Sequence, residues 1–404
     1  MIPVSDARAR ILAALPRMPA ETVALADGLG RVLAEALTAR RTQPPFAVSA
    51  MDGWAARQAD LGTIPTTLTP IGAVAAGARF EGAVGLGETV RIFTGAPLPD
   101  GADAIVIQED ADLGADGLLT VREAPKPGQW IRRAGLDFSE GDLLIPAGRQ
   151  LGPTDIALAA AMNRPWLAVR RKPRIAVLAT GDELARPGDP IGPNQIVSSN
   201  NFGICALVRE SGGEAVDLGI ARDTEADLRA MAEAAAGCDL LITLGGASVG
   251  EHDLIHKVLG TGGGGIDFWK IAMRPGKPLM FGRADLRDKG SIPLLGLPGN
   301  PVSAMVCGQL FLRPAILAML GQDWTVQTEL VPSATDLAAN DKREDYLRAR
   351  LRQEADGRLV VDASSKQDSS MLRLLTDADG LVIRPALAPP VKAGELVPFL
   401  RLRR

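Results

Sequence analysis

The chain has 404 residues, more than one hydrophobic core accommodates, so its length predicts two to four domains. Its formal net charge of −4 provides no broad basic face for a nucleic acid, and any anion site must therefore be local. No apolar run reaches the roughly 20 residues that span a bilayer, and no signal peptide is evident. The three cysteines share no C-x-x-C spacing, which argues against a disulfide framework or zinc knuckle. We expect a cytoplasmic protein without a membrane or nucleic-acid partner.

The first 173 residues mix helical and β-rich patterns. After a possible cap at Ser5, apolar residues recur at helical spacing over 7–15, and a second amphipathic stretch covers 29–37. Short apolar runs then alternate with Gly and Pro turns up to about residue 152, and a helix follows over 154–161. This order predicts a β-rich domain inserted between helical segments.

Strands and helices alternate from residue 174. The expected strands cover 174–180, 215–219, 239–244, 266–271, 279–281 and 292–297. The expected helices cover 202–210, 224–236, a segment from about 251, and 301–320. This alternation predicts a parallel sheet with helices on both faces. From residue 324 onward, short strands with Gly and Pro turns predict a small β domain.

Ligands bind beyond the carboxyl ends of the strands in an open α/β sheet, so the segments that follow these strands are candidate sites. The first, Thr180-Gly181-Asp182-Glu183, offers a hydroxyl and two carboxylates, although an ordinary Asp-capped turn also explains it. The second contains Gly245, Gly246 and Ser248 between a strand and a helix. Small residues there suit either a phosphate-binding loop or a plain glycine turn.

A third candidate segment, Leu297-Pro298-Gly299-Asn300-Pro301, precedes the last long helix. Asn300 suits a helix N-cap and Pro301 the first helical position, so a structural cap is a complete local explanation. Between the second and third segments, Lys270, Arg274 and Lys277 alternate with apolar residues across a Pro-Gly break. We interpret them as a local anion site, with charges on an exposed edge strand as the alternative.

One metal-binding pattern is weighed and set aside. His252 and His256 flank Asp253 at a spacing close to the H-E-x-x-H of zinc peptidases. Asp replaces Glu, which shortens a general base, and the chain has no third histidine. A solvated helix turn explains both histidines better.

Read in order, seven segments resemble the molybdenum insertase family, which includes MoeA and the E domain of gephyrin. They are S-A-M-D-G-W-A, R-I-F-T-G-A-P-L-P, I-R-R-A-G-L-D, A-T-G-D-E-L, G-G-A-S-V-G-E-H-D, W-K-I-A-M-R-P-G-K-P and G-L-P-G-N-P-V-S. The resemblance runs from the first helix to the C-terminal β domain. It departs from the family at Trp54, where Tyr is common, at Arg274, where Lys is frequent, and in a glycine-rich loop over 261–265.

The resemblance implies an α/β plus β fold in a multidomain, elongated chain. A central parallel-sheet α/β pterin-binding domain is expected over 174–322, and a small C-terminal β domain over 323–404. An inserted β-rich domain is expected over 46–135. A discontinuous helical and β region is expected over 1–45 and 136–173. The family also implies a homodimer whose active cleft takes residues from both subunits.

The implied activity is that of a molybdopterin molybdenumtransferase, which inserts molybdate into adenylated molybdopterin and releases AMP. By resemblance the catalytic residues are Asp52, Thr94, Asp137, Glu183, Asp223 and Asp253. The implied substrate-binding residues are Arg132, Gly245, Gly246, Ser248, Lys270, Arg274, Lys277, Pro298, Pro301 and a serine near Asp368, for which we take Ser370 as the candidate. Implied protein partners are the molybdopterin adenylyltransferase and proteins of molybdoenzyme maturation.

Charge suggests the role of each group. Molybdate and the pterin phosphate are anions, so Lys270, Arg274, Lys277 and Arg132 are suited to hold them. Carboxylates repel molybdate and are better placed as Mg²⁺ ligands or as bases that position water; we take Glu183 and Asp253 as the metal ligands. The mechanism needs no protein cysteine.

Three other functions remain as alternatives. The same α/β domain occurs in the adenylyltransferase that precedes insertion, although that enzyme is typically the single domain. A related domain in nicotinamide-nucleotide processing proteins is more remote. A non-catalytic scaffold is the alternative from a different class, and the full set of carboxylates and cations argues against it.

Overall fold

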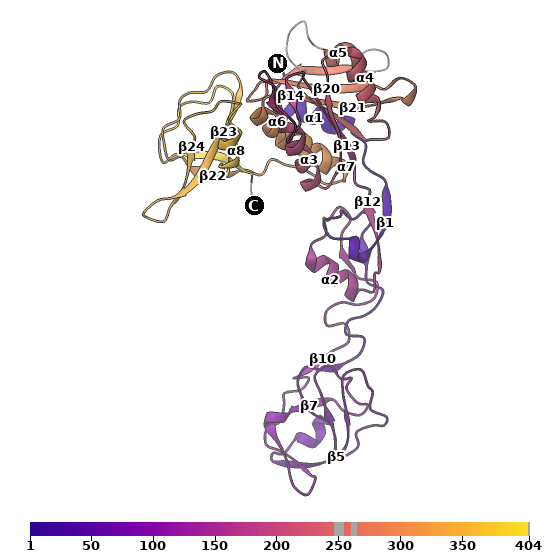
Figure 1. Ribbon diagram of the computed structural model, residues 1–404. Coiled ribbons are helices and arrows are strands. Elements are labelled where there is room, and N and C mark those ends of the chain that lie inside the picture. Colours follow the sequence, from indigo (N-terminus) through magenta and orange to yellow (C-terminus); the bar gives the residue numbers. More distant parts are fainter. Residues whose placement is uncertain (246–253, 260–264, 403–404) are drawn as a thin grey trace. The chain divides into compact units, whose positions relative to one another are not determined.

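The computed structural model describes residues 1–245, 254–259 and 265–402 (Figure 1). They fall into two compact units. The first comprises Met1–Glu21 with Arg170–Arg404, and the second comprises Thr22–Val169.

A six-stranded sheet forms the centre of the first unit, in the order β16-β13-β17-β21-β20-β18. Its strands are β13 (Arg174–Thr180), β16 (Glu214–Ala221), β17 (Leu240–Leu244), β18 (Ile266–Lys270), β20 (Pro278–Asp285) and β21 (Ser291–Leu297). The sheet is parallel, as predicted, over β16, β13, β17 and β21, whereas β20 is antiparallel to both of its neighbours, β21 and β18. This difference arises because short connections link β18, β20 and β21, while a parallel pair needs a longer crossover.

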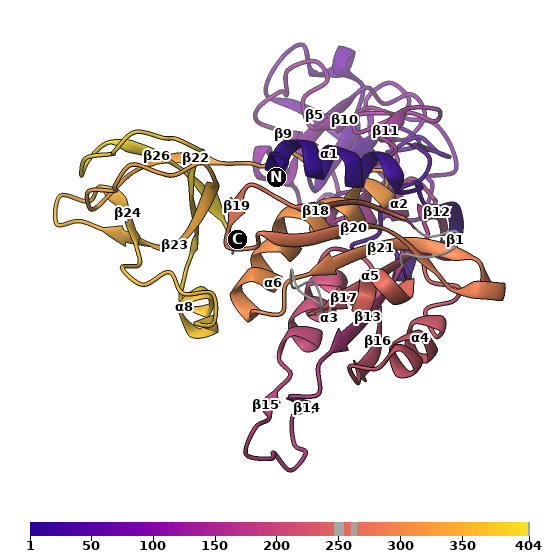
Figure 2. The ribbon, with the colours of Figure 1, turned by 90° about the horizontal axis from the view of Figure 1, so that it is seen from above.

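Helices cover both faces of this sheet, as predicted (Figure 2). They are α3 (Asn200–Glu210), α4 (Glu225–Glu233), α5 (Leu254–Leu259), α6 (Pro301–Cys307) and α7 (Arg313–Met319). On one face α4 and α5 bury a core that includes Leu178, Leu228 and Val258. On the other face α3 packs against α6 and α7. Because β13 and β17 lie in the middle of the sheet, their apolar runs are buried almost throughout.

The last helix of this domain is continuous but not uniform. A π-helical segment, Gly308–Leu312, connects α6 to α7. Among the described residues, Pro301–Met319 is the one helix long and apolar enough to cross a membrane, and 72% of that window is buried inside the protein. Its apolar character therefore reflects its place in the core. The first helix, α1 (Val4–Ala14), packs against α7.

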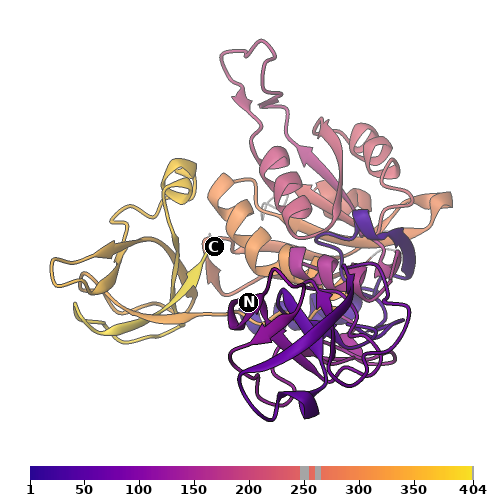
Figure 3. The same cartoon turned by 90° about the horizontal axis from the view of Figure 1, so that it is seen from below.

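The chain makes an excursion between β13 and α3. It carries β14 (Leu184–Ala185) and β15 (Ile196–Val197), which pair in parallel. Figures 2 and 3 both show it extending away from the sheet. Ile191, Ile196 and Val197 are exposed on it.

The C-terminal part of the first unit is a β domain, as predicted. Its sheet has the order β19-β23-β25-β26-β22, and β24 pairs with β23. The elements are β19 (Met273–Arg274), β22 (Glu329–Pro332), β23 (Glu344–Gln353), β24 (Leu359–Ala363), α8 (Leu372–Thr376), β25 (Gly380–Arg384) and β26 (Leu396–Arg401). Since β19 precedes β20 in the chain, the pairing of β19 with β23 joins this sheet to the α/β domain.

The second unit is largely β, with a sheet in the order β7-β4-β6-β5-β9-β8. These strands are β4 (Gly53–Ala56), β5 (Thr66–Val74), β6 (Glu88–Ile92), β7 (Ala104–Ile107), β8 (Ala111–Leu113) and β9 (Leu119–Val121). Short pairs complete the unit: β1 (Ala20–Ala24) with β12 (Trp166–Arg170), β2 (Leu37–Thr38) with β11 (Leu143–Ile145), and β3 (Val48–Ser49) with β10 (Ile131–Arg132).

The helix α2 (Pro153–Ala161) matches its prediction, but the predicted helix over 29–37 is wrong. There, Leu33 forms an isolated bridge with Val169 and is buried in a core shared with Phe138. Tertiary packing has thus overridden an amphipathic pattern in a short segment.

Candidate functional site

Two neighbouring strand ends of the α/β sheet bring carboxylates together. The N–H of Asp223, which follows β16, donates to Asp182 Oδ1 at 3.3 Å, and the N–H of Gly181 donates to the carbonyl of Ala221 at 3.2 Å. The Glu183 carboxylate turns back over Gly181, where an added Cβ would lie 2.5 Å from Oε2. The structure thus places Glu183 and Asp223 at adjacent strand ends and adds Asp182, whose contact the sequence did not predict.

Gly245 joins the first and third candidate segments. Its N–H donates to the Leu297 carbonyl at 3.2 Å, and a Cβ on it would lie 3.0 Å from the Thr180 carbonyl oxygen. With φ at +90°, this position also favours glycine. Gly246, Ser248 and Asp253 lie outside the described residues, and so does His252.

The loop after β21 is anchored by the C-terminal domain. The Asn300 amide donates to Ser369 Oγ at 3.0 Å, and the N–H of Val302 donates to the Ser369 carbonyl at 3.0 Å. Asn300 occupies the N-cap position of α6, as predicted, but its side chain makes no cap hydrogen bond. The predicted capping role is therefore wrong, because the amide reaches across to the C-terminal domain. Pro301 is the first helical residue, as predicted.

The two serines of this loop have different partners. Ser370 donates to the Asp368 carboxylate at 2.6 Å, a local bond within its own loop. Ser369 is the serine in contact with the Pro298–Pro301 segment. The two serines thus differ in the segment that each contacts.

A buried arginine supports the serine loop. The Arg348 guanidinium, 1% exposed, donates to Gln367 Oε1 at 3.1 Å and to the Asp368 carbonyl at 2.8 Å. Burial lowers the pKa of Arg348, and the nearby Asp368 opposes that shift. The buried Arg348 guanidinium thus anchors the loop that carries Ser369, and carbonyl oxygens accept most of its hydrogen bonds.

The three predicted cations lie close together in the chain but differ in their surroundings. Lys270 ends the edge strand β18, while Arg274 lies in β19, and both Arg274 and Lys277 are exposed. Between the latter two, Gly276 packs against Cys307, whose Sγ would lie 2.4 Å from an added Cβ. Glycine at φ +108° therefore lets the cation segment pass over the core.

Arg274 is already engaged by carboxylates. Its Nε and Nη2 donate to the two oxygens of Asp345 at 2.9 and 2.5 Å, and its Nη2 lies 3.7 Å from Asp341. Arg343 binds the same Asp341 at 2.9 Å. The hydrogen bonds that Arg274 donates to Asp345 raise the pKa of Arg274, and those that Arg343 donates to Asp341 lower the pKa of Asp341 to about 2. Arg274, the predicted anion ligand, is thus part of an ion-pair network whose carboxylate partners no local sequence pattern identifies.

In the second unit, Asp52 and Thr94 form one group. The N–H and the hydroxyl of Thr94 both donate to Asp52 Oδ1, each at 2.8 Å. These bonds lower the pKa of Asp52. The contact exists because Asp52 precedes β4 and Thr94 follows β6, which are antiparallel neighbours. On the other side of β4, Gly53 permits the close pairing with β7, because a Cβ there would lie 2.1 Å from the Val106 carbonyl oxygen.

The other two candidates of this unit, Arg132 and Asp137, are exposed. Arg132 ends β10, which pairs with β3, and the N–H of Gly95 donates to the Ser49 carbonyl of β3 at 2.9 Å. Arg132 is therefore one strand away from the loop of Thr94. Asp137 is exposed, and its N–H donates to the Gln43 carbonyl at 3.0 Å.

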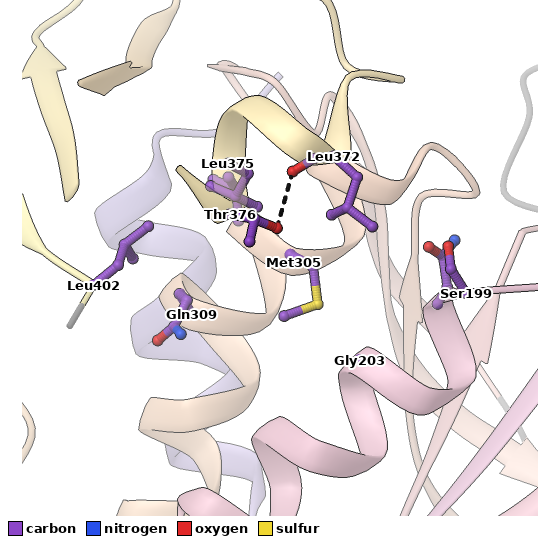
Figure 4. Close-up of a pocket in the computed structure, with 10 residues that line it drawn as sticks. Ser199, Gly203, Met305, Gln309, Leu372, Leu375, Thr376 and Leu402 are labelled. Atoms are coloured by element: carbon purple, nitrogen blue, oxygen red, sulfur yellow. Dashed lines mark hydrogen bonds between the residues drawn. The ribbon is translucent and has the colours of Figure 1, made fainter. Parts of the chain in front are cut away.

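A cavity of about 230 Å³ lies where α8 approaches α3 and α6 (Figure 4). Met305, Leu372 and Leu375 give it a mainly apolar wall. Asn200, on its rim, donates to the Gly299 carbonyl at 2.6 Å, which links the cavity to the Pro298–Pro301 segment. Such a wall suits an apolar group or a ring more than an anion.

Within the part of the chain that the structure describes, no three His, Cys, Asp or Glu side chains converge as a metal site. The strand-end carboxylates Asp182, Glu183 and Asp223 are nevertheless oxygen donors, the type that Mg²⁺ prefers. Because Mg²⁺ often binds through only one or two carboxylates plus substrate phosphates, this donor set fits it.

Comparisons with known proteins cover nearly the whole chain. Residues 2–163 match a family model described as MoeA N-terminal region (domain I and II). Residues 176–318 match one described as "Probable molybdopterin binding domain", and residues 331–402 match the MoeA C-terminal region (domain IV).

Relatives and solved structures agree with these matches. A molybdopterin molybdenumtransferase of Haemophilus influenzae is 35% identical over 402 residues, which is 98% of each chain. One of Nostoc sp. is 33% identical over 95% of this chain and 88% of its own. The crystal structure of a molybdopterin biosynthesis MoeA protein from Pyrococcus horikoshii superposes over 100% of both chains with a TM-score of 0.84 and 30% identity. The chain therefore belongs to the MoeA family of molybdopterin molybdenumtransferases.

Proposed function

We propose that this protein inserts molybdenum from molybdate into adenylated molybdopterin and releases AMP, a step of molybdenum cofactor biosynthesis. The observation that carries the proposal is similarity along the entire chain. Relatives named molybdopterin molybdenumtransferase align over 98% and 95% of it, and these alignments cover 98% and 88% of the relatives themselves. A single-domain adenylyltransferase would match only the α/β part.

We assign anion binding to Lys270, Arg274 and Lys277 in the first unit and to Arg132 in the second. Guanidinium and ammonium groups bind molybdate and phosphate oxygens through charge-assisted hydrogen bonds. The exposed positions of Arg274 and Lys277 support this role. The loops of Gly245, Gly246 and Ser248 would contact the phosphates through backbone N–H groups.

The nucleotide end of the substrate is assigned to Pro298 and Pro301. Support comes from the contacts of this segment with Ser369 and Asn200, which hold it at the edge of the sheet. We assign Ser369 to the site in place of Ser370, because Ser369 is the one that reaches this loop.

The carboxylates are assigned to Mg²⁺ and to water. Glu183 and Asp253 would hold the ion, and a bound Mg²⁺ would neutralise pyrophosphate charge as AMP leaves. Asp52, held by Thr94, stays ionised over a wide pH range because its pKa is lowered. A weakly basic carboxylate of this kind suits orientation of water or a ligand more than proton abstraction. Asp137 would assist in the same way.

We further propose the oligomeric state, the protein partners, the cellular location and the domain boundaries. We propose a homodimer with residues of both subunits in the active cleft. We also propose contacts with the molybdopterin adenylyltransferase and with proteins of molybdoenzyme maturation. A cytoplasmic location is in keeping with three free, buried cysteines. The domain boundaries 1–45 with 136–173, 46–135, 174–322 and 323–404 are proposed as functional divisions.

The proposal is tested by offering the protein two alternative reactions. One reaction contains adenylated molybdopterin, molybdate and Mg²⁺; the other contains ATP, molybdopterin and Mg²⁺. AMP formation in the first alone supports the insertase. Pyrophosphate formation in the second would move the protein to the adenylyltransferase step, and inactivity in both would favour a scaffold.

A further inference from the structure

Two arginines and two aspartates form a connected network beside the cation segment. Asp345 binds Arg274 through two hydrogen bonds, of 2.9 and 2.5 Å. Asp341 lies between the two cations, 2.9 Å from Arg343 and 3.7 Å from Arg274. We call these four residues the arginine–aspartate network. Two cations face two carboxylates, so the formal charges of the network cancel.

The two aspartates are held very differently. The Asp345 side chain is 9% exposed, sits in β23 opposite Arg384, and engages Arg274 with both oxygens. The Asp341 side chain is 45% exposed, and its separation from Arg274 is too long for a hydrogen bond. Separation from Arg274 would therefore cost the buried Asp345 carboxylate more free energy than it would cost Asp341, because water readily solvates an exposed carboxylate.

We propose that Asp341 is an internal counter-ion that competes with the substrate oxyanion for Arg274 and Arg343, while Asp345 is the positioning residue that holds Arg274. The inference rests on the proposed function, in which molybdate is the oxyanion. A tetrahedral dianion offers several oxygens to two guanidinium groups and displaces the single carboxylate. Arg274 stays hydrogen-bonded to Asp345 while the anion replaces Asp341, so the orientation of its guanidinium group does not change.

This arrangement also gives a reason for arginine at position 274. A guanidinium can hold Asp345 through Nε and Nη2 in a planar fork and still present Nη1 and its remaining hydrogens to an anion. A lysine ammonium is a point donor and cannot make the same two-point attachment.

The test measures the Kd of molybdate by equilibrium dialysis with the full-length protein. Asp341→Asn removes the competing charge but keeps an Oδ1 that can accept the Arg343 N–H, now bonded at 2.8 Å. We expect molybdate to bind about two- to fivefold more tightly to this variant. Asp341→Glu keeps the charge and should stay close to wild type. Asp345→Asn should weaken binding, since Arg274 loses a charged anchor.

Asp336→Asn is the matched control, because Asp336 is a similarly exposed aspartate of the same domain that pairs with Lys392. Its Kd should equal that of wild type. Unchanged or weaker binding by Asp341→Asn, with wild-type binding and AMP release intact, would overturn the inference and leave the proposed function standing. Absence of molybdate binding in every variant would overturn both the inference and the assignment of Arg274 to the anion site.

Discussion

The side-chain amide of Asn300 donates to the hydroxyl of Ser369 at 3.0 Å, across 69 positions of sequence. The bond joins the loop after β21 to the loop before α8, and the Ser369 carbonyl accepts the N–H of Val302 as well. The first N–H groups of a helix have no acceptor within the helix. The Ser369 carbonyl provides an acceptor for one of them, whereas the Asn300 side chain provides none. The C-terminal domain thus helps to shape the proposed nucleotide segment.

Ser369 should matter more for turnover than Ser370. We expect Ser369→Ala to lower kcat/KM for AMP release by about tenfold, as loss of an oriented hydrogen bond of roughly 1.4 kcal/mol predicts. Ser370→Ala removes only a bond to Asp368 in the same loop and should cost less than threefold, by the roughly 0.5 kcal/mol of an exposed bond. Single-turnover kinetics of both variants provide the comparison, and equal losses would argue against the assignment of Ser369.

Thr94 should control the titration of Asp52. Its N–H and hydroxyl lower the Asp52 pKa, so the ionised carboxylate stabilises the folded state above the usual pKa. That contribution is lost as the pH falls through the lowered folded-state pKa. Thr94→Val removes the hydroxyl but keeps the N–H, and we expect the Asp52 pKa to rise part of the way to 3.8.

Carbon-detected NMR titration measures this shift. Asp155 is an internal control, because its pKa is lowered mainly by the N–H of Gly152, which the substitution leaves alone. If Asp52 titrates identically in wild type and Thr94→Val, the hydroxyl does not contribute to its ionisation.

Gly276 should be much less tolerant of substitution than Gly290. Both have positive φ, +108° and +86°, but only Gly276 faces a close neighbour, Cys307 Sγ at 2.4 Å from a built Cβ. Gly290→Ala should cost about 1–3 kcal/mol of unfolding free energy through backbone strain alone, because its φ of 86° and ψ of −156° lie in a region that is essentially restricted to glycine. Gly276→Ala should cost about 1–3 kcal/mol more through overpacking. Urea unfolding of the two variants tests this order, and equal stabilities would contradict the packing argument.

The three cysteines should be unreactive in the folded protein. Burial raises the pKa of Cys205 to about 11, and it raises the pKa of Cys238 and of Cys307 as well. Because the thiolate is the reactive form, a thiol reagent at pH 8 should label the native protein far more slowly than the unfolded one. Mass spectrometry after brief labelling identifies any site that reacts, and rapid modification of a cysteine in the native protein would contradict its buried position.

The sequence predicted long, strongly patterned elements well. The strand over 174–180 matches β13 because a central strand, buried on both faces, reads as a continuous apolar run. The helix predicted over 301–320 is present as α6, the π segment and α7. A long apolar run predicts a buried helix but does not predict where its hydrogen-bond pattern changes from α to π. The strands β18 and β20 are also predicted, but their antiparallel pairing is not, because strand direction depends on connections rather than on residue pattern.

In the site, too, local motifs predict individual residues but not the contacts between distant ones. Motifs located Asp52 and Thr94 separately, and only the pairing of β4 with β6 brings them into contact. The partners of Arg274 lie about seventy residues away in another domain, beyond the reach of any local pattern. Asn300 precedes a proline at the start of a helix, a pattern that predicts a cap. The same pattern occurs whether the Asn300 amide caps the helix or bonds to Ser369, so the local sequence does not distinguish the two.

The central claim is tested most directly by single-turnover AMP release from adenylated molybdopterin with Mg²⁺, with and without molybdate, for wild type and Asp52→Ala. Molybdate-dependent release by wild type that is lost in Asp52→Ala, with the variant's thermal unfolding unchanged, is the result we predict. Release of AMP that is independent of molybdate, or a folded Asp52→Ala variant that releases it at the wild-type rate, would contradict the account.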